Sequence, residues 1–314
     1  MTGYNIDFAL RLITGNPSFS YNVLSDEIRF RIADNSFWLE LQGFVEKGFL
    51  CGGVTLPSEE LPRGYEAISG QYGYAILDAF ELDGKKLLQL SNPKGVADWN
   101  GSWALNSRKW TSRFKGMVLQ RFIKRKSREK KIKEKPLILT SVSKELFNDK
   151  SFFVSWEEFI KCFEIVFASI SFDNSWSYIR ILDRWSEKHS IGSTFCLDLL
   201  GQNPQYLLRL SEGMEVFFLL ILQLPVSEKK VRKIGFSIHK YEGKLVNENG
   251  VVPSLVAIGR YSAEKAISLN CTLNEGEYVI LVTAYEIEQD NSFTLTMWYP
   301  KKNNKSIYLN RLNN

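Results

Sequence analysis

Residues Gln71–Trp103 read QYGYAILDAFELDGKKLLQLSNPKGVADWNGSW. Within this stretch Tyr74–Leu77 and Lys86–Leu90 are short apolar runs, and the turn residues Leu82-Asp83-Gly84 stand between them. Apolar runs of this length, joined across an Asp-Gly turn, predict the two antiparallel strands of a β-hairpin. Downstream, Trp-x-Gly-x-Trp at 99–103 predicts two core indoles on one side of a turn, with the glycine allowing close approach.

Helix signals flank the hairpin. An apolar i, i+3, i+4, i+7 stripe runs from Phe37 to Val45, follows Asn35-Ser36 and ends at Gly48. This pattern predicts a helix with a cap at each end. After the hairpin, Ser155-Trp156-Glu157-Glu158 is a capping box, which predicts a helix that continues through Phe163.

From Trp176 onward the pattern changes to short apolar runs about ten residues apart, separated by Gly, Asn, Pro or Glu clusters. The runs are Tyr206–Leu210, Val216–Leu224, Ile234–His239, Leu255–Ile258, Ala266–Cys271, Tyr278–Ala284 and Phe293–Tyr299. This spacing is typical of an antiparallel β-sandwich. We therefore predict an α+β domain over 1–172 and an all-β sandwich over 173–314, with the boundary near Ser171–Ser175.

Composition is that of an ordinary globular protein. The 314 residues are enough for two domains, and 44% are hydrophobic and 24% charged. These values exclude collagen-like, wholly disordered and disulfide-dense chains. No apolar run approaches the ~18 residues of a membrane-spanning helix, and MTGYNIDFAL at the start lacks the pattern of a signal peptide. The four cysteines are widely spaced and form no CxxC, which predicts free thiols in a reducing compartment.

Charge is unevenly distributed. Residues 108–135 hold 13 Lys and Arg and 2 Glu, a net +11 within a chain of +5, which leaves −6 for the rest. The core of this region is Lys124–Lys135, KRKSREKKIKEK, and such a run favours a solvated loop or a frayed helix. The alternative is a docking patch for an acidic protein surface or an anionic lipid. Nucleic acid is disfavoured because no aromatic residues interrupt the run. The candidate contacts are Lys124, Arg125, Lys126, Arg128, Lys130 and Lys131.

The order of these motifs resembles a known family. Residues 71–103 resemble the second protease subdomain of calpains, G-H-A-Y-S-V-L-D…L-x-x-L-x-N-P-W-G-x-x-x-W-x-G-x-W. Further similar segments are Leu12–Gly15, Phe37–Leu50, Asp149–Phe159, Asn203–Tyr206, Ile234–Ile238 and Gly276–Ile280. The resemblance implies a papain-like second protease subdomain followed by a C2-like β-sandwich. The basic region falls where the family has a loop, so residues 111–146 are interpreted as an insertion.

Calpains resemble papain in using a Cys–His–Asn arrangement, in which a thiolate attacks the peptide carbonyl and an imidazole transfers the proton. At the position of the family's histidine this chain has Tyr72, and a phenol with a pKa of about 10 accepts a proton poorly near pH 7. Asn92 matches the family's asparagine, and Lys94 replaces the tryptophan that shields the site. These departures predict a protein that does not catalyse proteolysis.

No other residue of the sequence is expected to replace the missing groups. The segment Q-G-x-x-G-D-C-W that holds the family's nucleophile has no counterpart in these 314 residues. Cys51 lacks an adjacent tryptophan and a helix of its own that could lower its pKa, so we expect it to be structural. The two histidines, His189 and His239, both fall in the β-sandwich region.

The calcium positions of the family are also depleted. Asp98 and Asp149 match two acidic ligands, whereas Leu105 and Ser151 stand at two others. Because calcium requires several oxygen ligands, no calcium or other cofactor is expected. Glu286, Glu288 and Asp290 form a small acidic cluster that we interpret as a solvated loop.

The resulting hypothesis is a catalytically inactive calpain homologue that serves as a protein-binding, structural or regulatory module in the cytoplasm, with a cytoskeletal or ciliary setting suggested by the resemblance. Its partners are expected at the open face of the protease subdomain and at the basic insertion. One alternative is half of a calcium-dependent cysteine endopeptidase that needs a partner chain with the nucleophile. The other is a peripheral membrane protein that binds anionic lipid through the sandwich and the basic run.

Overall fold

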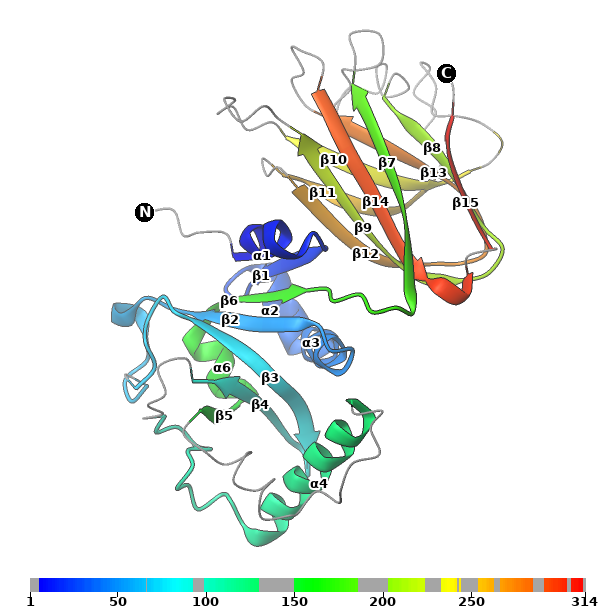
Figure 1. Ribbon diagram of the computed structural model, residues 1–314. Helices are drawn as coiled ribbons and strands as arrows, with labels where there is room; N and C mark the ends of the chain where they lie inside the picture. The colour runs from blue at the N-terminus through cyan, green and yellow to red at the C-terminus, as the bar shows by residue number, and fades with distance from the viewer. Residues whose placement is uncertain are drawn as a thin grey trace. The chain divides into compact units, whose positions relative to one another are not determined.

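The computed structural model describes residues 6–65, 67–92, 99–129, 150–185, 203–223, 233–241, 243, 254–262, 266–284, 291–303 and 306–312 (Figure 1). The chain divides into two compact units. The first comprises residues 1–9 and 18–171, and the second comprises residues 10–17 and 172–314. Each unit is built on antiparallel sheets, and the described α-helices lie between residues 6 and 162.

The first unit contains, among its described residues, one six-stranded antiparallel sheet in the order β1-β6-β2-β3-β4-β5. The strands are β1 (Ser18–Asn22), β2 (Leu50–Thr55), β3 (Gly73–Leu82), β4 (Lys85–Ser91), β5 (Ser151–Ser155) and β6 (Phe163–Ser169). The predicted hairpin is confirmed as β3 and β4. Its two-residue turn has positive φ at both Asp83 (50°) and Gly84 (68°), the geometry that suits the twist of a tight hairpin.

The described helices are α1 (Ile6–Thr14), α2 (Asp26–Ala33), α3 (Ser36–Glu46), α4 (Ser112–Glu129) and α6 (Trp156–Cys162), with short 3₁₀ turns η1 (Ser58–Glu60) and η2 (Lys301–Asn303). Helix α3 is the one predicted from the apolar stripe, and it ends before Gly48, which has φ 77°. Asn35 is the N-cap residue, as its position before the stripe suggests, but its side chain makes no cap hydrogen bond. Instead the Asp34 carboxylate accepts from the Ser36 amide at 2.8 Å, and Asn35 binds Lys86 on β4.

The capping box at Ser155 is confirmed, but its helix is shorter than predicted. The Ser155 hydroxyl accepts from the Glu158 amide, and the Glu158 carboxylate accepts from the Ser155 amide. Helix α6 ends at Cys162, and Phe163 already begins β6. The chain leaves the helix there because β6 pairs with both β1 and β2 and places Val166 and Ala168 in the core.

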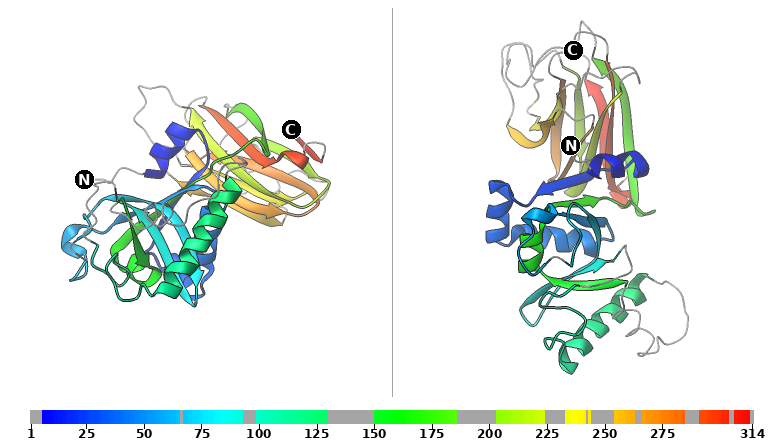
Figure 2. Two further views of the ribbon diagram at one scale, coloured as in Figure 1. Left: turned by 60° about the horizontal axis from the view of Figure 1, so that its bottom comes forward. Right: turned by 90° about the vertical axis from the view of Figure 1, so that its left-hand side faces the viewer.

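Helix α4 includes Lys124–Glu129, the first half of the run Lys124–Lys135 for which a solvated loop or frayed helix is predicted, and the rest of that run lies outside the described residues. Its Phe114 and Val118 are buried in one cluster with Phe80 of β3 and Leu87 of β4. Figures 1 and 2 show where α4 lies in the first unit. The other members of this cluster are Trp103, Trp110 and Phe153, with Leu82, Leu119 and Phe122 packed at its margin. Burying the apolar side chains of α4 stabilises a helix that is otherwise rich in Lys and Arg.

The second unit is a sandwich of two antiparallel sheets over its described residues, in the orders β11-β10-β13-β8-β15 and β12-β9-β14-β7. Its strands are β7 (Trp176–Trp185), β8 (Gln205–Leu210), β9 (Met214–Gln223), β10 (Ile234–Lys240), β11 (Leu255–Ser262), β12 (Ala266–Leu273), β13 (Gly276–Ala284), β14 (Asn291–Pro300) and β15 (Ile307–Leu312). All seven predicted apolar runs correspond to strands, although Leu224 itself lies outside the described residues. Strands β7 and β15 were not among the predicted runs. Both alternate half-buried with exposed residues, as edge strands of their sheets.

Polar bonds tie the two sheets of the sandwich together at β7. The Trp185 indole nitrogen donates to the Val282 carbonyl on the facing sheet at 3.2 Å. The Asp183 carboxylate accepts from the Tyr206 hydroxyl at 2.6 Å and from Arg311 at 2.8 Å. Burial raises the pKa of the Tyr206 phenol, and its bond to Asp183 raises it further. Tyr206 therefore stays a neutral donor, and it fastens β8 to the edge of the opposite sheet.

Candidate functional site

Tyr72 and Asn92, two of the three positions that the sequence indicates as a lost catalytic set, lie at the same end of the β3–β4 hairpin. Tyr72 immediately precedes β3 and Asn92 immediately follows β4, and the antiparallel register pairs Ile76 with Leu90. Both side chains are half-buried. Lys94, the third position, lies outside the described residues.

The backbone at Tyr72 is held by a buried threonine. The Thr55 hydroxyl accepts from the Tyr72 amide at 3.0 Å, and the Thr55 amide donates to the Tyr72 carbonyl at 3.1 Å. The Tyr72 ring makes an edge contact with the Tyr74 ring at 5.5 Å between centroids. On the other strand, the Asn92 amide donates to the Lys150 carbonyl at 2.8 Å, which extends the pairing of β4 with β5. The hairpin end is thus a firmly positioned part of the sheet.

Cysteine chemistry at this end is disfavoured by where the thiols lie. Cys51 is the second residue of β2, paired with Ile76 on one side and Ala168 on the other, and it is buried. Burial raises the pKa of the Cys51 thiol to about 12, and likewise those of Cys162 and Cys271. Near neutral pH these three thiols are therefore protonated, whereas nucleophilic attack requires a thiolate. Cys196 lies outside the described residues.

The described part of the first unit offers no histidine as a base at the hairpin. His239 is buried on β10 in the second unit, where its Nε2 is 2.8 Å from the Ser237 hydroxyl oxygen. His189 lies outside the described residues. No histidine is therefore found in the described part of the first unit.

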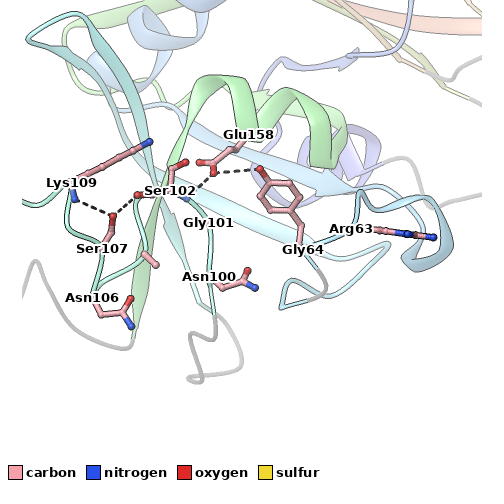
Figure 3. Close-up of a pocket in the computed structure, with 11 residues that line it drawn as sticks. Arg63, Gly64, Asn100, Gly101, Ser102, Asn106, Ser107, Lys109 and Glu158 are labelled. Carbon is pink, nitrogen blue, oxygen red and sulfur yellow. Dashed lines mark hydrogen bonds between the residues drawn. The ribbon is translucent and has the colours of Figure 1, made fainter.

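A polar pocket of about 580 Å³ opens between the segment that follows Trp99, residues 63–65 and Glu158 of helix α6 (Figure 3). Its lining residues are Arg63, Gly64, Tyr65, Asn100, Gly101, Ser102, Ala104, Asn106, Ser107, Lys109 and Glu158. A Cβ atom at Gly101 would lie 2.2 Å from the Trp99 indole, so the loop closes only with glycine there. This confirms the close approach that the Trp-x-Gly-x-Trp spacing predicts.

Glu158 lines the pocket and joins three segments through hydrogen bonds. Its Oε1 accepts from the Ser102 amide at 2.7 Å and from the Tyr65 hydroxyl at 3.4 Å, and its Oε2 serves the capping box (Figure 3). Burial alone would raise the pKa of this carboxyl, but the hydrogen bonds from Ser102 and Ser155 outweigh it and lower the pKa. The sequence indicates Glu158 only as a helix cap. Its second role, in holding the 99–103 loop, depends on a contact between residues 56 positions apart.

The predicted calcium remnants, Asp98 and Asp149, lie outside the described residues, as do Glu286, Glu288 and Asp290. Of the two substituted positions, Leu105 is exposed, and Ser151 is buried with its hydroxyl accepting from the Gln89 amide at 2.9 Å. Within the described part of the chain, no group of three or more His, Cys, Asp or Glu residues could hold a metal ion.

Two cationic side chains of helix α4 form ion pairs within the first unit. Arg121 and Arg125 both reach the buried Asp78 carboxylate on β3, at 3.2 and 3.0 Å. Arg125 also donates to the Leu77 carbonyl at 2.8 Å. Arg125, one of the predicted partner contacts, is therefore already bound within the chain.

The remaining predicted contacts divide by location. Lys124 is exposed on α4, Lys126 and Arg128 belong to the last turns of the same helix, and Lys130 and Lys131 lie outside the described residues. None of the described helices combines the length and the apolar content that crossing a bilayer would require.

Comparison with known proteins identifies relatives of this chain. The chain is 26% identical over 212 residues to the calpain-type cysteine protease ADL1 of Oryza sativa subsp. japonica, a match that covers 67% of this chain and 9% of the relative. It is 24% identical to calpain-5 of Mus musculus over 72% of this chain and 35% of the relative. It is 21% identical to the calpain-2 catalytic subunit of Mus musculus over 83% of this chain and 40% of the relative. The chain thus spans less than half the length of these relatives.

Family models cover both units. The model described as calpain large subunit, domain III, matches residues 182–298, within the β-sandwich. The model described as calpain family cysteine protease matches residues 1–169, which is more than half of the chain. The chain therefore belongs to the calpain family of cysteine proteases.

Proposed function

We propose that this calpain-family protein acts by binding rather than by cleaving peptide bonds. In this proposal the first unit corresponds to the second subdomain of a papain-like protease core, and the second unit is a C2-like domain. The matches of the two family models to residues 1–169 and 182–298 support this division. A fold can persist while its chemistry is lost, and its surfaces then become the useful part.

One observation carries the proposal: Tyr72 occupies the position that the resemblance assigns to the family's base, and it lies at the same end of the β3–β4 hairpin as Asn92. Cysteine proteolysis needs an imidazole that accepts a proton from the thiol and returns it to the leaving amine. A phenol does not accept a proton near neutral pH. This reasoning concerns the residue at position 72, so it holds whether or not further protein segments accompany the chain.

The half-enzyme alternative makes a different prediction at the same residue. If a separate chain supplied the nucleophile, Asn92 would still need an imidazole to orient. Because this chain has Tyr72 at the position of the base, adding a nucleophile from another chain should not restore peptide hydrolysis. The alternative is therefore testable by replacing the base and the nucleophile independently.

The experiment mixes the purified chain with the cysteine-bearing first subdomain of a calpain relative, in calcium, and follows hydrolysis of a fluorogenic peptide. We expect no turnover from the natural chain with or without the added subdomain. Tyr72→His is the gain-of-base variant, and Tyr178→His, at an exposed position of β7, is the matched control for an added imidazole. Turnover that needs Tyr72→His would strongly support the proposal, and turnover by the natural chain with the subdomain would establish the half-enzyme.

Calcium is not part of the proposed function. Two of the family's four acidic positions in this unit are Leu105 and Ser151, and Ser151 is already committed to Gln89. We expect the thermal midpoint in millimolar calcium to equal that in chelator. A calcium-dependent rise of several degrees would require ligands from other parts of the chain.

The proposed partner is another protein, contacted at the Tyr72–Asn92 end and at the basic helix, in the cytoplasm or on the cytoskeleton. The free thiols of Cys51, Cys162 and Cys271 are compatible with a reducing compartment. Peripheral binding to anionic membranes is the competing proposal for the basic segment. Co-sedimentation with vesicles that contain or lack phosphatidylserine separates the two.

A further inference from the structure

Strand β7 forms one edge of the four-stranded sheet in the second unit, and it is the longest of the described edge strands (Figure 1). Its residues all pair with β14 in one unbroken register, from Trp176 opposite Pro300 to Trp185 opposite Asn291. The edge strand β11, by contrast, pairs with β10 through two register shifts. Natural sheets discourage further pairing at their edges with short strands or bulges. Because β7 is long and regular, its edge can accept another strand.

The two sheets of the sandwich differ in width at this edge. Strand β7 lies opposite β8, since the Tyr206 hydroxyl of β8 donates to the Asp183 carboxylate of β7. Strand β15 extends the five-stranded sheet beyond β8, which leaves it without a counterpart among the described strands of the other sheet. Ile307 and Leu309 of β15 pack against the core but are only partly buried. A strand added beside β7 would cover them.

The outward face of β7 alternates apolar and cationic side chains. Tyr178 and Leu182 are 57% and 70% exposed. Arg180 and Arg184, the other two residues of this face, are also exposed. The Arg180 guanidinium lies over the Tyr178 ring and donates to the Thr296 hydroxyl at 3.1 Å. Where the structure describes the chain, neither arginine forms an ion pair with a carboxylate.

A pocket at the start of β7 adds positive charge to the same edge. Its volume is about 560 Å³, and its lining residues are Ser175, Trp176, Pro300, Lys301 and Lys302. Both lysines are exposed. An apolar side chain entering this pocket would contact Trp176, and an acidic neighbour would meet the lysines.

We propose that β7 is the docking edge for an extended acidic segment of a partner protein, which adds to the sheet as a fifth strand. In such pairing the main-chain hydrogen bonds supply affinity, and alternate side chains supply specificity. Asp or Glu on one face of the segment would lie beside Arg180 and Arg184. Apolar residues on its other face would lie beside Ile179 and Ile181, above β15. The partner chemistry is therefore a segment in which acidic and apolar residues alternate.

A second copy of the chain matches this edge less well. Two copies that paired through β7 would place four arginines on their outward faces, which carry no Asp or Glu. Like charges on neighbouring strands repel each other. The arginines therefore oppose self-association and favour an acidic strand.

The test uses the full chain and a fluorescent peptide of about ten residues, the length of β7, in which Glu and Val alternate. Anisotropy at low salt measures its binding. A second peptide, in which Glu and Pro alternate, has the same charge but lacks the amide donor at every second residue. It therefore cannot pair as a strand.

Two variants of the chain separate the edge from net charge. The edge variant is Arg180→Glu with Arg184→Glu. The matched control is Arg29→Glu with Lys161→Glu, two exposed cations of α2 and α6 that make the same change in net charge. Thermal melts establish that each variant is folded.

We expect the edge variant to weaken binding of the Glu-Val peptide about tenfold or more, because two attractions become repulsions, and the control variant to change it less than about twofold. The Glu-Pro peptide should bind the natural chain about tenfold more weakly or worse. Amide hydrogen exchange in residues 176–185 should slow when the Glu-Val peptide binds, because an added strand protects edge amides.

Equal losses in both variants, or equal binding of the two peptides, would show an effect of charge alone and would overturn the proposal. Failure of the Glu-Val peptide to bind the natural chain would do the same. Self-association that this peptide displaces would assign the edge to a second copy, which also contradicts the proposal. None of these readouts involves peptide hydrolysis, so failure of the docking edge and failure of the proposed function remain distinguishable.

Discussion

The attachment of α4 to the sheet depends on Asp78, and replacing it tests how the basic helix is held. The Asp78 side chain is only 5% exposed, and its carboxylate receives Arg121 at 3.2 Å and Arg125 at 3.0 Å. The substitution Asp78→Asn preserves its shape and removes its charge. Arg121 and Arg125 would then lie beside a neutral amide at the surface of the core.

The expected loss of stability follows from the solvent exposure of Asp78, Arg121 and Arg125. Removing one partner of a fully buried ion pair costs about 3–5 kcal/mol. Here the two arginine side chains are 27% and 34% exposed, so water compensates part of the loss. We expect a decrease of about 2 kcal/mol in the free energy of unfolding. For a unit of this size that corresponds to a thermal midpoint lower by about 4–8 °C.

Two measurements check the prediction. Differential scanning fluorimetry gives the midpoint, and limited trypsin digestion reports on cleavage after the α4 cations, which should accelerate once the helix is loosened. The control is Asp83→Asn, which removes the exposed 3.9 Å contact with Arg113 and should cost less than about 0.5 kcal/mol. Equal midpoints and equal digestion rates for the Asp78 and Asp83 variants would refute the idea that Asp78 anchors α4.

Three further predictions address the loop, the pocket and the thiols. Gly101→Ala would place a Cβ 2.2 Å from the Trp99 indole and should cost about 1–3 kcal/mol, whereas Gly116→Ala on α4, with nothing within 4 Å of its Cβ, should stabilise the helix by about 0.5–1 kcal/mol; chemical denaturation measures both. The pKa of Glu158 is lowered on folding, so its contribution to stability is present above the unfolded pKa of about 4.5 and is lost as the pH falls below it; Glu158→Gln should flatten this part of the stability–pH curve, and an unchanged curve would count against the hydrogen-bonded carboxylate. The pKa of Cys51 is raised to about 12, so the stability that its protonated thiol contributes is complete below about pH 9 and lost between pH 9 and 12; iodoacetamide should label the native thiol slowly at pH 8 and rapidly in denaturant, and fast native labelling would contradict the buried position.

Local sequence signals predicted the parts of the fold that depend on neighbours along the chain. The hairpin followed from its Asp83-Gly84 turn, and the capping box at Ser155 was recognisable because both of its partners lie within four residues. The seven sandwich strands were visible because their apolar side chains form compact runs. Strand β15 was missed because only alternate residues, such as Ile307 and Leu309, pack against the core.

The features that the sequence did not predict depend on contacts between residues far apart in the chain. Helix α4 was obscured because its charges outnumber its apolar residues, and the aromatic cluster that buries Phe114 includes Trp103 and Phe153 from other segments. The role of Glu158 in the pocket was missed because Ser102 lies 56 positions away. Tyr72 and Asn92 could be placed together from sequence because a hairpin connects them. A partner contacts the folded surface, which brings together residues from distant segments. Patterns among neighbouring residues do not predict such a surface.

The threonine bonds at Tyr72 have an evolutionary consequence. Thr55 grips this position entirely through the main chain, by the amide and the carbonyl of residue 72. These hydrogen bonds therefore do not depend on which side chain residue 72 carries. Evolution could therefore replace a catalytic side chain at position 72 by an unreactive one without losing the Thr55 hydrogen bonds. Protein engineering could reverse that substitution, or introduce another reactive side chain at the same position.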